Sequence, residues 1–99
     1  MEHLEFKAQI LFLESASKYF RFPIKIKKIR LSFWLLDSTS STPSETEFEE
    51  YIFINRYYDV NIMIIYMEFL NNKISEGQSF YIGIYPEIVA KGKILKIYE

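Results

Sequence analysis

Acid–base or metal chemistry in this 99-residue chain would have to begin at its one histidine, His3. A catalytic base needs a neighbour that fixes it, and a metal site needs further ligands. His3 lies almost at the N-terminus, in a stretch that we expect to fray, and a Ser–His–Asp arrangement would require it to meet distant partners. The absence of cysteine excludes thiolate zinc sites, iron–sulfur clusters and thiol nucleophiles. We therefore predict a protein that is not an enzyme and that holds no metal and no cofactor.

Nucleotide binding is also not expected. The three glycines are far apart, and neither a phosphate loop of the GxxxxGK type nor a GxGxxG fingerprint occurs. Glu49 and Glu50 are adjacent, so in an extended segment they would point to opposite faces, which argues against a carboxylate pair for acid and base work.

The densest basic stretch is a candidate partner-binding surface, formed by Lys25, Lys27, Lys28 and Arg30. Aromatic residues lie beside it in the sequence, and such an arrangement can grip phosphates and stack on bases. The same aromatic residues would serve equally as core packing, and a sequence pI near 5.9 is far below that of a typical nucleic-acid-binding domain. The stretch therefore favours a protein-binding or solvated face, with RNA as a second candidate partner.

The middle of the chain is acidic, and its second candidate surface comprises Glu45, Glu47, Glu49 and Glu50. These carboxylates would form either a solubilising loop or an electrostatic lure for a basic partner. The second interpretation fits an immunity protein, since small acidic proteins that neutralise toxic nucleases often present carboxylates to a cationic active site. In that hypothesis Tyr57 and Tyr58 are exposed aromatic contacts.

Composition predicts one folded domain over residues 1–99. Apolar residues make up 49% of the chain, including nine Phe and eight Tyr, which is enough for a core without disulfides. No apolar run approaches the roughly 18 residues that span a bilayer, and the N-terminus lacks the basic start of a secretory signal. We expect a soluble, cytoplasmic protein that does not bind membranes.

Strand patterns dominate the first third of the chain. Residues 4–12 alternate apolar and polar side chains with a period of two, which indicates a half-buried strand. A second strand is expected from Ile24, where the apolar phase shifts at Lys27 and Lys28. Either a β-bulge or a loop between two strands would explain this shift. Residues 37–50 are rich in turn formers, with Phe48 as their one bulky apolar side chain, and predict a long, mobile surface loop.

The second half predicts further strands. Residues 51–54 and 60–70 are apolar, β-branched and aromatic, and the surrounding pattern favours strand over buried helix for the longer run. Residues 80–84 alternate, and residues 88–98 carry Gly92 in their middle, where a strand glycine often marks a bend or a close backbone approach. About six strands with no convincing helix predict an all-β domain.

The order of these signals resembles the C-terminal β-barrel domain of elongation factor Tu. Residues 77–82 follow a Gly-x-x-Phe-x-Ile pattern, and the glycine-centred run 88–97 comes next, like the closing hairpin of that domain. Residues 6–13 are similar to its first strand, and residues 23–33 to its Thr-Pro, Gly-Tyr-Arg-Pro-x-Phe segment. The glycine of that segment is replaced in the Lys27–Lys28 region and its second proline is Leu31. These departures fall where the family's barrel makes functional contacts, so the resemblance does not by itself imply that this chain holds aminoacyl-tRNA.

The resemblance implies a closed six-stranded antiparallel β-barrel. On this basis we expect a stand-alone, non-catalytic binding module that docks onto a protein partner, with translation-related or RNA-associated partners favoured. The alternative hypothesis is an immunity protein that blocks a toxin through the acidic loop and exposed tyrosines.

Overall fold

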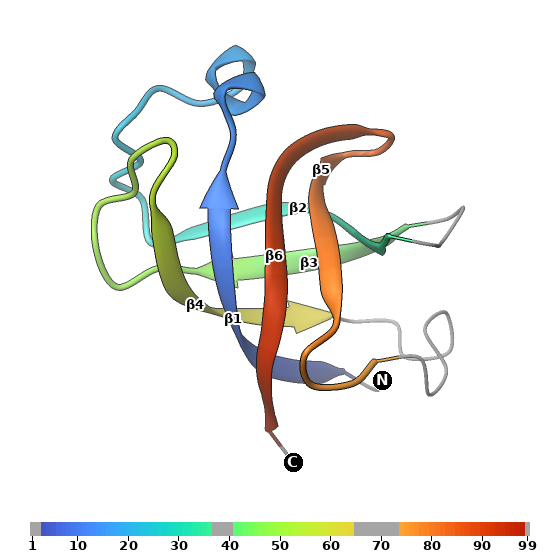
Figure 1. The fold of residues 1–99 in the computed structure, drawn as a ribbon. Coiled ribbons are helices and arrows are strands. Elements are labelled where there is room, and N and C mark those ends of the chain that lie inside the picture. Colours follow the sequence, from blue (N-terminus) through green and yellow to red (C-terminus); the bar gives the residue numbers. More distant parts are fainter. Residues whose placement is uncertain (1–2, 37–40, 65–73, 99) are drawn as a thin grey trace.

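The strands of the chain close into an antiparallel barrel (Figure 1). The computed structural model describes residues 3–36, 41–64 and 74–98. Around the barrel the strands follow the order β1-β4-β3-β2-β5-β6. The elements are β1 (Leu4–Phe12), the short 3-10 helix η1 (Glu14–Lys18), β2 (Lys28–Leu35), β3 (Thr42–Glu47), β4 (Tyr57–Ile64), β5 (Ser79–Ile84) and β6 (Glu87–Tyr98). The predicted all-β, closed six-stranded barrel is confirmed. In the described ranges no helix has the length and apolar character needed to cross a membrane.

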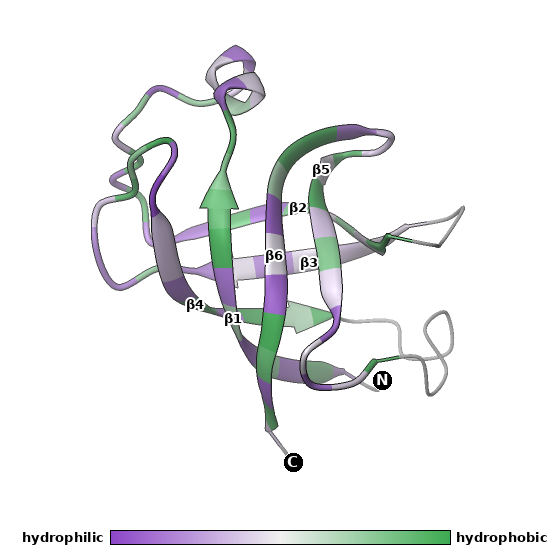
Figure 2. Ribbon diagram, in the orientation of Figure 1, coloured by the Kyte–Doolittle hydropathy of each residue, from purple (hydrophilic) through white to green (hydrophobic). Residues whose placement is uncertain are grey.

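Strand β1 closes the ring, because it pairs with β4 on one side and β6 on the other. Its predicted alternation is confirmed: the apolar side chains of Phe6, Ala8, Ile10 and Phe12 are fully buried, while the residues between them face outward. Figure 2 shows the same alternation of hydrophobic and hydrophilic residues along the strands. One face of each strand therefore fills the barrel.

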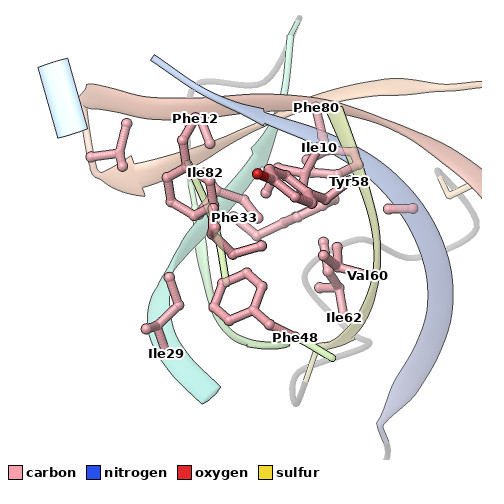
Figure 3. Packing of buried hydrophobic residues seen from close by; sticks show 14 of the residues in the cluster. Ile10, Phe12, Ile29, Phe33, Phe48, Tyr58, Val60, Ile62, Phe80 and Ile82 are labelled. Atoms are coloured by element: carbon pink, nitrogen blue, oxygen red, sulfur yellow. The ribbon is translucent and has the colours of Figure 1, made fainter. Parts of the chain in front are cut away.

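Phenylalanine rings fill the interior in two groups. The ring centroid of Phe6 lies 5.8 Å from that of Phe33 and 6.0 Å from that of Phe80, and the last two are 4.9 Å apart. These contacts join β1, β2 and β5. Nearer one end, Phe12 contacts Phe20, Phe22 and Phe48 at 6.4, 5.9 and 6.0 Å. Figure 3 shows Phe12, Phe33, Phe48 and Phe80 among the buried residues. Each tilted or edge-on pair contributes about 0.5–1.5 kcal/mol beyond its buried area.

The prediction of a loop over residues 37–50 is wrong for Thr42–Glu47, which form β3 between β2 and β4. Thr42, Ser44 and Thr46 face inward and are buried, so the alternation is polar throughout, and Figure 2 shows a pale to hydrophilic strand. Its two neighbours supply the ladder partners, which is why a strand forms without apolar residues. Phe48 follows directly and is only 2% exposed. Residues 37–40 lie outside the described part.

The inner face of β3 is hydrogen-bonded only in part. The Ser44 hydroxyl donates to the Leu31 carbonyl at 2.8 Å. The hydroxyl oxygens of Thr42 and Thr46 are buried and have no partner among the described residues. A buried hydroxyl without a partner costs about 1–3 kcal/mol.

The apolar phase shift at Lys27 and Lys28 is a loop, not a bulge. Ile24 makes one isolated bridge with Ile52, and β2 begins only at Lys28. The predicted strand over residues 51–54 is therefore wrong, since this stretch contributes a single bridge. Strand β4 begins at Tyr57, before the expected start at residue 60, and residues 65–70 lie outside the described part. Register shifts occur instead along β6, against β1 and against β5.

Gly92 marks a close approach, as predicted from its position within a strand. It lies in β6 opposite Ile10 of β1 and Phe80 of β5. A Cβ atom placed on Gly92 would lie 2.5 Å from Cζ of Phe80 and 2.6 Å from the carbonyl oxygen of Gln9. The Phe80 ring could move only into the packed interior, and the Gln9 carbonyl belongs to the β1 backbone.

We predict that Gly92→Ala lowers the free energy of unfolding by about 1–3 kcal/mol, because the added methyl group overpacks the contact with Phe80 and β1. Urea unfolding of the purified chain measures the change. The matched control is Lys93→Ala, an exposed position in the same strand, which should change stability by no more than about 0.5 kcal/mol. Equal effects of the two substitutions would show that Gly92 is not a steric constraint.

Candidate binding site at the β3–β4 connection

The predicted basic and acidic stretches face each other on neighbouring strands. In the register of β2 and β3, Lys28 lies opposite Glu47 and Arg30 opposite Glu45. The Lys28 ammonium lies 3.6 Å from carboxylate oxygens of both glutamates, and Arg30 Nε lies 3.2 Å from Glu45 Oε2. Exposed ion pairs of this kind add only about 0–1 kcal/mol each to stability. Their larger effect is that these four charges offset one another, so neither stretch forms a uniform surface of one sign.

The other members of the two stretches gather around the β3–β4 connection, residues 48–56. Lys25 places its ammonium 5.8 Å from the ring centroid of Tyr51. Lys27 is exposed, and its carbonyl accepts the N–H of Phe48 at 2.7 Å. Glu49 and Glu50 are both exposed. The structure thus places these four predicted site residues near one connection.

A shallow depression of about 510 Å³ lies between this connection and the start of β4, and we call it the aromatic depression. Tyr51 and Tyr57 are 59% and 61% exposed, and the Arg56 guanidinium lies 4.8 Å from the ring centroid of Phe53. The depression is lined by Glu50, Tyr51, Phe53, Arg56, Tyr57, Tyr58 and Asp59. Tyr and Arg are among the side chains enriched where proteins bind one another.

The prediction that Tyr57 and Tyr58 are both exposed is wrong for Tyr58. Successive residues of a strand face opposite sides, so only one of the two can face solvent. Tyr58 is 8% exposed, and its hydroxyl oxygen accepts the N–H of Phe53 at 2.9 Å. Figure 3 shows its ring with the core residues. Tyr58 therefore supports the connection from inside, while Tyr57 faces solvent as expected.

A second depression, of about 350 Å³, adjoins the first and shares Glu50 and Asp59 with it. We call it the acidic depression. The Lys7 ammonium lies 3.6 Å from a carboxylate oxygen of Asp59, and the Tyr98 hydroxyl donates to the side-chain oxygen of Asn61 at 3.1 Å. The depression is lined by Lys7, Glu49, Glu50, Asp59, Val60, Asn61 and Tyr98. Its three carboxylates outnumber the single ammonium, so the lining of this depression is net negative.

A third depression, of about 330 Å³, lies across β2, β3 and the end of β5. Arg30 and Glu45 line it, but they form an ion pair with each other. Its remaining lining is Leu31, Ser32, Pro43, Ser44, Gly83 and Ile84. It therefore offers a ligand fewer charged partners than the two depressions at the β3–β4 connection.

Another charged cluster joins η1 to the start of β6, and sequence reasoning missed it. The Tyr19 hydroxyl and the Lys18 ammonium both donate to the Glu87 carboxylate, the latter at 3.0 Å. These two hydrogen bonds lower the pKa of Glu87, and the bond with Glu87 raises the pKa of Lys18 and of Tyr19. The Ser15 hydroxyl also donates to the Ile88 carbonyl at 2.7 Å. The cluster clamps η1 to the barrel.

His3, the residue considered for acid–base or metal chemistry, lies apart from these clusters. His3 is exposed, with Nε2 3.8 Å from a carboxylate oxygen of Glu5. Across residues 3–36, 41–64 and 74–98, no three side chains of histidine, aspartate or glutamate converge in an arrangement that could hold a metal ion.

In sequence comparisons, no protein-family model matches the chain and no curated protein matches it.

We predict that Tyr58→Phe reduces stability by about 1 kcal/mol, because the Phe53 N–H loses its acceptor. Amide exchange of Phe53 should also become faster, which NMR of the labelled chain would measure. The matched control is Tyr57→Phe, which removes the same atom from the exposed neighbour and should leave both quantities unchanged. If Phe53 exchanged at the wild-type rate in Tyr58→Phe, the hydroxyl would not be its anchor.

The Glu87 clamp predicts a dependence of stability on pH. Because the folded-state pKa of Glu87 is lowered, its stabilising contribution is present above the unfolded-state pKa and is lost as pH falls through the folded value. Chemical unfolding at neutral and strongly acidic pH should therefore show a wild-type advantage over Glu87→Gln that shrinks in acid. The exposed Glu14→Gln is the control, and its difference from wild type at the two pH values sets the background against which Glu87→Gln is compared. An advantage of Glu87 that is independent of pH would contradict this assignment.

Proposed function

We propose that this barrel is a non-catalytic binding module that docks onto a protein partner through the β3–β4 connection and the adjoining part of β4. The observation that carries the proposal is the aromatic depression, where two tyrosines are more than half exposed beside Phe53 and Arg56. Such large, stiff side chains contribute most of the binding energy in protein interfaces, and they cost little conformational entropy to immobilise.

The distribution of charge favours protein over RNA. Lys28 and Arg30 of the basic stretch are each within ion-pair distance of a glutamate. The acidic depression is lined by three carboxylates against the single ammonium of Lys7, and this net negative lining would repel a phosphate backbone. A protein surface with basic side chains would be attracted to these carboxylates instead.

The resemblance to the C-terminal barrel of elongation factor Tu stays a prediction. It supports a binding role and favours translation-related partners, but a shared fold is only an analogy for function.

A second candidate function is supported by the negative charge beside Tyr57. An immunity protein that neutralises a toxin would present such carboxylates and tyrosines to a cationic active site. In that case the captured partner is a basic enzyme, and its activity falls when the barrel binds.

The test compares capture from native lysate by the wild-type chain and by two double variants. Tyr51→Ser with Tyr57→Ser removes the exposed aromatics, whereas Leu36→Ser with Leu95→Ser removes comparably exposed apolar side chains elsewhere. We expect a partner that the wild type and the control retain, and that the tyrosine variant binds at least about tenfold more weakly once purified.

Two outcomes would overturn the proposal. Equal loss in both double variants would show that the aromatic depression is not the docking surface. Capture that survives the tyrosine substitutions, but is abolished by ribonuclease or by Lys25→Ala, Lys27→Ala and Lys28→Ala together, would identify RNA as the ligand.

A further inference from the structure

Strand β4 has one neighbour along half of its length and two along the other half. Its pairing with β1 runs from Tyr57 to Ile64. Its pairing with β3 covers only residues 61–64, and ends where Glu47 lies opposite Asn61. Among the described residues, no strand therefore pairs with the edge of β4 over residues 57–60 on the side away from β1. We call this part of β4 the open edge.

The connection after β3 does not replace the missing strand, because its backbone hydrogen bonds go to other segments. The N–H of Phe48 donates to Lys27, and Ile52 exchanges two bonds with Ile24 at 2.8 and 3.1 Å. The N–H of Asn55, a residue with a left-handed φ of 62°, donates to the carbonyl of Phe12 at 2.9 Å. Figure 1 shows the chain swinging away from β4 after β3 before it returns.

The aromatic depression lies beside the open edge, and the acidic depression crosses the outer face of β4 to reach Lys7 of β1 and Tyr98 of β6. The aromatic depression is lined by β4 residues 57–59, and the acidic depression by residues 59–61. Glu50 of the connection lines both, so it stands across from the strand where the depressions meet. Space of about 510 Å³ thus adjoins residues 57–59 of the open edge, and the acidic depression continues from Asp59 across the outer face of β4.

We propose that the open edge receives an extended, basic segment of the protein partner as an additional strand. This inference rests on the proposed function and names the way in which the partner is held. Every second residue of a strand directs its N–H and C=O groups toward the same neighbour, so the open side of β4 carries backbone groups to which an added strand would bond. Extended peptides bind other sheet edges in this way, with affinity from main-chain bonds and specificity from alternate side chains.

The charges beside the edge define the occupant. Tyr57 and Asp59 face outward on alternate positions of β4, and Glu49 and Glu50 lie across the depressions. Lysine or arginine at every second position of the added strand would meet the carboxylates of Glu49 and Glu50, and would share Asp59 with Lys7. A β-branched residue between the basic positions would suit an extended backbone. Proline within the segment would remove a ladder donor and is excluded.

The probe is a capped peptide of alternating lysine and threonine, titrated into the full labelled chain and followed by amide NMR and hydrogen exchange. We expect saturable shifts centred on residues 57–61 and slower exchange of the amides on the open side. The matched control peptide keeps every side chain but carries N-methyl groups on its backbone, and it should bind at least about tenfold more weakly. A peptide with glutamate in place of lysine should also bind weakly.

Two protein variants separate the charge contribution from general effects. Glu49→Gln with Glu50→Gln should weaken binding of the lysine peptide severalfold. Glu5→Gln with Glu14→Gln removes the same charge outside both depressions and should leave the affinity within about twofold of wild type.

Equal binding of the N-methylated peptide would overturn strand addition, because charge alone would then explain the affinity. The absence of saturable binding, or shifts centred on other strands, would overturn it too. The proposed function is judged separately: a captured partner that is lost in the Tyr51→Ser/Tyr57→Ser variant but leaves the amides of residues 57–61 unprotected supports docking at the aromatic depression and refutes strand addition.

Discussion

The barrel depends on the close approach of β6 to β1 at Gly92. Without a side chain there, the Phe80 ring lies against the β6 backbone and reaches Phe6 and Phe33 in the interior. Strand β1 in turn pairs with both β4 and β6, so the contact joins the two ends of the sheet into a ring. Closure and core packing are therefore one constraint: a wider spacing at Gly92 would loosen the phenylalanine group and the ladder together.

Most of the strands can be predicted from the alternation of apolar side chains. This prediction fails where the inward face of a strand is not apolar. Residues 4–12 were predictable as a strand because Phe6, Ala8 and Ile10 sort to one side. Strand β3 was not, because Thr42, Ser44 and Thr46 fill its inward positions. Its pattern of hydroxyl residues alternating with Pro43, Glu45 and Glu47 has the same period of two, but hydrophobicity does not mark it. In such a strand the neighbours decide the conformation more than local preference does.

The candidate site was predictable in its residue types but not in its pairing. Exposed tyrosine and glutamate near the middle of the chain could be expected, and Tyr57 and Glu50 do line the depressions. That Lys28 meets Glu47 depends on the register between two strands, which single-sequence patterns do not specify. The hydrogen bond between Tyr19 and Glu87 joins residues far apart in the chain, and the local sequence around either residue does not predict it.

The polar interior of β3 makes the junction between β2 and β4 the least hydrophobic part of the ring, and the open edge adjoins it. A ring of strands is a cooperative object, since each one completes the hydrogen bonding of the next. A ligand that recognises the edge only while the ring is closed raises the free energy of opening by mass action. Binding at the open edge and pairing of the neighbouring strands are then thermodynamically linked. A bound partner would therefore stabilise the closed barrel, and this stabilisation would be lost when the partner dissociates.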